Sequence, residues 1–175
     1  MKKIKRVLVC AAVIAVCYLL ETTIFRHLSL ASITPNLLIV VTSSYGFMRG
    51  KKEGLFIGFA CGFLRDLMGD DLLGFYAMIY MVIGYLNGFF RRMFYDEDIK
   101  LPLVLISASE LLYSVSVYVF LFLLKSDFRF FYYFGHIMMP ELLYTILLTL
   151  VLYQIILHLN RRLEEEEKRS ASRFV

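Results

Sequence analysis

The chain has 175 residues, 59% of them hydrophobic, and its mean hydropathy of +0.68 is higher than a soluble domain of this size normally shows. Its formal net charge is +4, but the Lys and Arg residues flank apolar runs, a pattern that indicates membrane topology rather than nucleic-acid binding. The three cysteines lie inside apolar runs without C-x-x-C spacing, so we expect no disulfide, no metal site and no cofactor.

Six apolar runs follow one another, and each predicts a transmembrane helix. The predicted spans are 7–25, 35–48, 53–69, 72–90, 101–124 and 137–159. Fifteen of the nineteen Lys and Arg residues lie before the first span or after the second, fourth and sixth. Cationic loops stay on the cytoplasmic side during insertion. The sequence therefore predicts one all-α integral membrane domain over residues 1–175, with six transmembrane helices, both termini cytoplasmic, and a cytoplasmic tail over 160–175.

The first span could also be a secretory signal, because it follows a basic start and precedes a weak cleavage site at 29–31. The approach to that site contains Glu21, Arg26 and His27, which would be unusually polar for a signal. Five further spans also make a cleaved signal unnecessary. A retained first helix is therefore the favoured interpretation.

The second span is short, and we expect it to begin at Pro35 with Thr34 as its N-cap. About 14 residues rise about 21 Å, less than the roughly 30 Å of the hydrocarbon core. A re-entrant hairpin made of the second and third spans would have its tip at 49–52 and would bury three cations in lipid. A true crossing is therefore predicted, either with local bilayer thinning or with the preceding residues 28–33 dipping into the interface.

Small residues recur at four-residue spacing on the first, third and fourth predicted helices. They are Ala11, Ala15, Gly54, Gly58, Gly62, Gly84 and Gly88. Missing side chains let helix backbones approach in lipid, where there is no hydrophobic drive to associate. We expect these faces to pack within the chain, and a docking surface for another membrane protein is the alternative.

Five ionisable residues lie within or at the ends of spans, where a charge costs a few kcal/mol or more. They are Glu21, Arg65, Asp66, Glu110 and Glu141. Glu110 lies near mid-depth, so we expect it to be protonated or hydrogen-bonded inward. The predicted topology puts Arg65 at the same outer depth as Glu21 and Glu141, which predicts an intramembrane polar network around Arg65. The alternative is that Arg65 extends to the outer headgroups.

The sequence shows no catalytic signature. It has no H-E-x-x-H, no G-x-S-x-G and no phosphate-binding glycine loop, and its carboxylates match no nucleophile–base arrangement. An ion-coupled transporter is also disfavoured, since no internal repeat or pair of broken helices is evident. We therefore predict a protein that is not an enzyme.

The predicted outer link 125–136 contains six aromatic residues. Such a cluster is typical of an interfacial belt at the headgroups. The alternative is an anchor for a partner protein, with Phe130, Phe131 and Tyr133 as the candidate contacts. The tail after Asn160 is expected to continue the last helix for a turn or two.

An ordered set of short motifs runs through the central third of the chain. They are Pro35-Asn36-Leu37-Leu38, Arg49-Gly50-Lys51-Lys52-Glu53-Gly54, Gly58 and Gly62 followed by Asp66, Gly74, and Gly84-Tyr85-Leu86. In this order and spacing they resemble the family of bacterial rod shape-determining proteins called MreD. Arg65 departs from the pattern, because it occupies a position where the family is expected to have an apolar residue.

This resemblance implies a non-enzymatic scaffold of the cell-elongation machinery in the bacterial cytoplasmic (inner) membrane. It implies MreC as the direct partner, and MreB, RodA and a penicillin-binding transpeptidase as the wider complex. The family is also similar in architecture to the vitamin-binding S-components of energy-coupling-factor transporters, which supplies an alternative function. S-components dock through an A-x-x-x-A pattern on the first helix, and Ala11 and Ala15 have that spacing.

Overall fold

The computed structural model describes residues 2–24, 34–67, 73–93, 99–123 and 130–171, and all regular structure in these ranges is helical. The elements are α1 (Lys2–Leu19), the π-helix η1 (Leu20–Ile24), α3 (Leu37–Arg49), α4 (Lys51–Asp66), α5 (Phe75–Asn87), the 3-10 helix η2 (Gly88–Met93), α6 (Lys100–Val117), the π-helix η3 (Tyr118–Leu123), α7 (Phe130–Tyr133), the π-helix η4 (Phe134–Met138) and α8 (Met139–Ala171). The predicted all-α class is therefore confirmed. The six longest helices, α1, α3, α4, α5, α6 and α8, correspond one to one to the six predicted segments.

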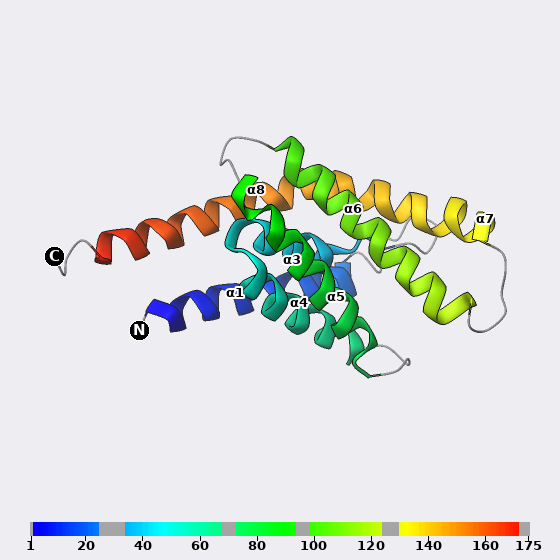
Figure 1. The fold of residues 1–175 in the computed structure, drawn as a ribbon, viewed down its shortest axis with the longest axis horizontal. Helices are drawn as coiled ribbons and strands as arrows, with labels where there is room; N and C mark the ends of the chain where they lie inside the picture. The colour runs from blue at the N-terminus through cyan, green and yellow to red at the C-terminus, as the bar shows by residue number, and fades with distance from the viewer. Residues whose placement is uncertain (1, 25–33, 68–72, 94–98, 124–129, 172–175) are drawn as a thin grey trace.

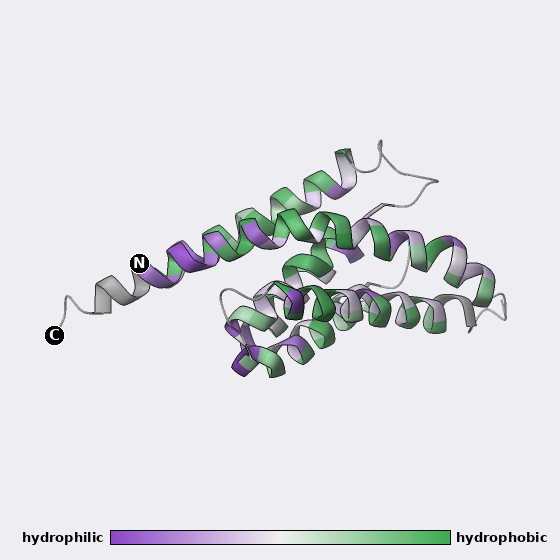
Figure 2. Ribbon diagram, turned by 90° about the horizontal axis from the view of Figure 1, so that it is seen from above, coloured by the Kyte–Doolittle hydropathy of each residue, from purple (hydrophilic) through white to green (hydrophobic). Residues whose placement is uncertain are grey.

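Three segments among the described residues are long and apolar enough to cross a membrane: Lys5–Ile24, Lys100–Phe120 and Phe131–Glu165. The helices α3, α4 and α5 have 13, 16 and 13 residues, so they rise only about 20–24 Å. Length and composition thus support three of the six predicted crossings. The start of α1 and the end of α8 lie at the same end of the molecule (Figure 1), and hydrophilic segments concentrate toward that end (Figure 2). The side of the membrane on which this end lies stays a prediction.

The helix α3 lies at the centre of the bundle and touches α1, α4, α5, α6 and α8 (Figure 1). All of its residues are buried. Its first half is apolar on every side and its second half carries Thr42, Ser43 and Ser44, as suits a helix surrounded by protein. Because neighbouring helices cover α3, its short length creates little mismatch with lipid.

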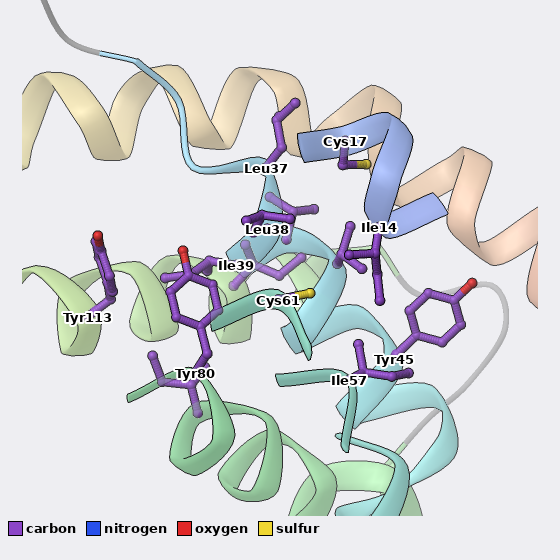
Figure 3. Packing of buried hydrophobic residues seen from close by; sticks show 14 of the residues in the cluster. Ile14, Cys17, Leu37, Leu38, Ile39, Tyr45, Ile57, Cys61, Tyr80 and Tyr113 are labelled. Carbon is purple, nitrogen blue, oxygen red and sulfur yellow. The ribbon is translucent and has the colours of Figure 1, made fainter. Parts of the chain in front are cut away.

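The apolar core joins α1, α3, α4, α5, α6 and α8, and much of it lies around the N-terminal half of α3 (Figure 3). Cys17 and Cys61 are 2% and 0% exposed and pack there as small apolar side chains. Tyr80 and Tyr113 meet edge to face at the side of this cluster, with ring centroids 5.5 Å apart. Most of the core therefore depends on contacts between segments that are distant in sequence.

The helices α4 and α5 are antiparallel and pack backbone to backbone. A Cβ added at Gly54 would overlap the carbonyl of Gly84, and one added at Gly58 would overlap the carbonyl of Tyr80. A Cβ at Gly62 would lie 2.5 Å from the Cα of Ala77. The spacing of four residues thus keeps one face of α4 in contact with α5 along its whole length.

Two helix boundaries differ from the predictions. The N-cap of α3 is Asn36 and not Thr34, because the Asn36 side chain accepts a hydrogen bond from the Ile39 N–H (3.3 Å). The last helical segment begins at Phe130, inside the predicted link, and the helix continues to Ala171, well into the predicted tail. Pro140 has no backbone N–H to donate to the preceding turn. The preceding turn is the π-helix η4, which lies directly before α8 and accommodates the proline.

Candidate functional site

A polar network lies around the N-terminus of α3, and Glu21 is its first component. Glu21 lies in η1, which directly follows α1; it is 6% exposed and forms an ion pair with Arg65 of α4. Its other carboxylate oxygen, Oε2, accepts hydrogen bonds from the backbone N–H groups of Leu37 (3.1 Å) and Leu38 (3.4 Å). A helix N-terminus carries unpaired N–H groups and a partial positive charge, so a carboxylate stabilises it. Glu21 therefore joins three helices at one point.

Asn36 joins the same end of α3 to two further helices. Its Oδ1 accepts a hydrogen bond from the Tyr80 hydroxyl of α5 (2.7 Å) in addition to the Ile39 N–H. Its backbone N–H donates to Oγ1 of Thr145 in α8 (3.1 Å). Sequence reasoning placed Asn36 in a motif but did not assign it, Tyr80 or Thr145 to the polar network. The one available signal was Asn directly after Pro35 and before an apolar run, a typical helix start.

The Arg65 guanidinium is partly enclosed by aromatic rings. Its Cζ lies 5.8 Å from the ring centroid of Tyr76 and 5.9 Å from that of Tyr113. The negative faces of these rings attract a cation, and the Arg65 side chain is 28% exposed. Arg65 is thus held by one carboxylate and two aromatic faces.

Two of the other predicted network residues are not hydrogen-bonded to Arg65. Glu141 is partly buried and lies close enough for electrostatic interaction with Arg65, but no ion pair joins them among the described residues. Glu110 is 1% exposed, and neither of its carboxyl oxygens has a hydrogen-bond partner in the part of the chain that the structure describes. A buried, unpartnered carboxyl is costly when charged.

Asp66 caps another helix. Its two carboxylate oxygens accept hydrogen bonds from the backbone N–H groups of Tyr76 and Ala77, each at 2.9 Å. These groups belong to the first turn of α5, whose own N-cap, Gly74, provides no side chain. Asp66 therefore ties the end of α4 to the start of α5, separately from Arg65.

Two further polar contacts cross the bundle between spans, and sequence reasoning did not identify them. Asn87 of α5 donates through Nδ2 to Oγ of Ser109 in α6 (2.7 Å). Near the end that carries the termini, Arg49 of α3 donates through Nε to Oδ1 of Asn160 in α8 (2.5 Å). Pairs of this kind depend on tertiary packing, which no local pattern reveals.

The faces proposed for packing or partner binding separate into two groups. The glycines of α4 and α5 are covered inside the molecule, whereas Ala11 and Ala15 of α1 are exposed. Beside Ala11 a groove of about 330 Å³ runs between α1 and α4, with Phe56 on its other wall. The Arg6–Glu53 ion pair (2.9 Å) bridges the two helices at this groove.

The outer aromatic residues are also placed differently from one another. Phe131 is 89% exposed, whereas Tyr133 packs against Tyr118 at the end of the α6 segment, with ring centroids 5.2 Å apart. The Phe130 side chain lies outside the described residues. Of the two side chains that the structure describes, Phe131 is the one that presents its ring at the surface.

The polar side chains of this network form ion pairs and hydrogen bonds that hold the helices together. Glu21 and Asp66 are occupied by helix N–H groups, and no group of three or more His, Cys, Asp or Glu residues that could hold a metal ion occurs within the described ranges. Five helices meet in the hydrogen bonds of Glu21 and Asn36 alone. The network therefore links these helices to one another at the N-terminal end of α3.

Comparison with known proteins yields one match. A family model described as rod shape-determining protein MreD matches residues 1–163 of the 175. No curated protein and no solved structure matches the chain.

Proposed function

Because this chain belongs to the MreD family of rod shape-determining proteins, matched over residues 1–163, we propose that it is a non-enzymatic scaffold of the bacterial cell-elongation machinery. In this role it lies in the cytoplasmic (inner) membrane as a multi-pass protein. It associates directly with MreC and links MreB to RodA and its penicillin-binding transpeptidase. The family match over nearly the whole chain is the observation that carries this proposal.

Features of the bundle support a scaffold. The buried carboxylates Glu21 and Asp66 and the partly exposed Arg65 join helices to one another. The groove between α1 and α4 has Ala11 and Ala60 on its walls, and small residues of this kind let another helix approach closely. Phe56, 71% exposed, provides an aromatic anchor there. We therefore propose this groove as the principal contact for the membrane helix of MreC, with Phe131 as an outer contact.

Depletion in the native bacterium tests the cellular role. Rod-shaped cells should round up while vitamin uptake stays intact, and the full-length chain supplied in trans should restore the rods. Normal cell shape together with lost vitamin uptake would overturn the proposal.

Co-purification with MreC tests the contact surface. Ala11→Leu fills the groove and should lower MreC recovery, whereas Ala12→Leu, at a neighbouring exposed position outside it, should not. Alanine at Phe130, Phe131 and Tyr133 together should weaken recovery through the outer contact. Equal recovery from the two α1 variants would exclude the groove as the binding surface.

The S-component-like function remains the second candidate, because Ala11 and Ala15 are both exposed on α1. A binding protein of this kind would retain a vitamin on purification. A vitamin extracted from the purified protein in stoichiometric amount would favour it, and a ligand-free protein that recovers MreC would favour the scaffold.

A further inference from the structure

A cationic hollow of about 650 Å³ lies between the α3–α4 turn and η2. Its lining includes five cationic residues and one carboxylate: Arg49, Lys51, Lys52, Arg91, Arg92 and Glu53. These residues come from two stretches of chain that are distant in sequence. Both stretches were predicted to be cytoplasmic loops.

Two glycines bring the stretches together. Gly50 has φ +100°, a left-handed conformation that lets the chain reverse between α3 and α4. Gly88, at the start of η2, lies directly on the backbone of Lys51, where a Cβ would overlap the Lys51 N atom. The Arg91 side chain crosses Gly50, with its Cδ 2.8 Å from the position a Cβ would take. The hollow is therefore set by backbone packing.

Most of the positive charge around the hollow is not neutralised. Glu53 pairs with Arg6 (2.9 Å), and Arg49 pairs with Asn160 and lies 4.0 Å from Glu164. The other four cations, Lys51, Lys52, Arg91 and Arg92, form no ion pair with any residue in the described ranges. Lys51 instead places its Nζ 3.4 Å from the ring centroid of Phe89. Four like charges around one hollow repel one another, so an anion there would be stabilising.

Membrane topology alone does not account for this arrangement. Retention of cationic loops depends on how many Lys and Arg residues each loop carries, and not on whether two loops direct them to one place. The hollow also adjoins the first turn of α4, which has no side-chain cap. Unpaired N–H groups at a helix N-terminus add to the attraction for a phosphate.

The exposed aromatic side chains beside the cations indicate which class of anion the hollow would bind. Phe89, which lines the hollow, is 50% exposed, and Tyr85 one turn earlier is 40% exposed. Cations beside an exposed apolar surface suit an amphiphile with an anionic head. We propose that this hollow binds the phosphate of an anionic phospholipid headgroup, with the acyl chains along the exposed side of α5 and η2.

Lipid retention by the full-length protein tests this proposal. The protein in non-ionic detergent is titrated with phosphatidylglycerol, with phosphatidylcholine of the same chains, or with inorganic phosphate, and bound lipid is counted by native mass spectrometry. The hollow variant is Lys52→Gln with Arg91→Gln and Arg92→Gln. The matched control is Lys5→Gln with Lys100→Gln and Arg162→Gln, three exposed cations outside the hollow.

We expect the wild type and the control to retain phosphatidylglycerol, and the hollow variant to bind it about 10- to 100-fold more weakly. The charge-conserving variant Lys52→Arg with Arg91→Lys and Arg92→Lys should bind phosphatidylglycerol as the wild type does. This result would show that the hollow variant binds weakly because it lacks the charges and not because it is misfolded. Equal losses in the hollow variant and the control, or equal retention of phosphatidylcholine, would overturn the proposal. Displacement of the lipid by millimolar inorganic phosphate would show that the ligand is a soluble phosphate and would also overturn it.

Discussion

Replacing Glu21 with Ala tests how the helices of this bundle are held together. The change removes the ion-pair partner of Arg65 and the acceptor of the Leu37 and Leu38 N–H groups at 3.1 and 3.4 Å. Removing one partner of a buried ion pair costs about 3–5 kcal/mol, and an unsatisfied buried N–H about 1–3 kcal/mol. Because Arg65 is 28% exposed and partly solvated, we expect the free energy of unfolding to fall by about 3–5 kcal/mol in total.

Arg65→Leu is the matched comparison. It removes the cation but leaves Glu21 hydrogen-bonded to α3, so we expect a smaller loss of about 1–2 kcal/mol. The loss in free energy of unfolding of the double variant should be smaller than the sum of the two single losses, because the double variant leaves no buried charge without a partner. Unfolding of the purified proteins by sodium dodecyl sulfate in mixed micelles measures all three. Additive losses, or an Arg65→Leu loss as large as that of Glu21→Ala, would refute this account of Glu21.

Three further predictions use thermal unfolding in detergent. Gly58→Leu should prevent stable packing of α4 on α5, because even a Cβ overlaps the Tyr80 carbonyl, whereas Gly135→Ala, in open space, should leave stability unchanged or raised. Asp66→Ala should cost about 1–2 kcal/mol and speed amide exchange in the first turn of α5; unchanged exchange there would contradict its capping role. Glu110→Gln should change stability by less than about 0.5 kcal/mol, since no hydrogen bond is lost. A growth defect in cells carrying this stable variant would instead indicate that Glu110 has a functional role.

Much of the fold could be predicted from the sequence. Apolar runs separated by short polar links specify helices whatever their neighbours, because in lipid every backbone group must be satisfied within its own helix. The alternation of cations predicted two cytoplasmic termini. The start of α1 and the end of α8 lie at the same end of the molecule, and the side of the membrane stays a prediction. Boundaries were less predictable. The sequence predicted that the aromatic residues 130–134 belong to a link, yet they form the first turns of the last helix.

The candidate site was predictable in its residue types but not in its connections. A charge in an apolar run must find a partner, so Glu21 and Arg65 could be singled out by cost alone. Predicted depth separated Glu21 from the mid-depth Glu110, but nothing local distinguishes Glu21, which pairs with Arg65, from Glu141, which forms no ion pair with Arg65 among the described residues. The contacts that Asn36 and Asn160 make between helices were not predicted, because an amide on an apolar helix is informative only once its neighbours are known.

By itself, the sequence determined the class of the molecule: an all-helical membrane chain of the MreD family, with glycine faces for close packing and cations gathered in alternate links. Those properties depend on the free energy of transferring each segment from water to lipid, which is set by the residues of that segment. Only the tertiary structure decided that α3 is central, that Glu21 and Asp66 cap helices, and that two basic turns share one hollow. Which side chains meet depends on the rotation and register of helices against each other, and these are properties of the packed bundle rather than of any segment.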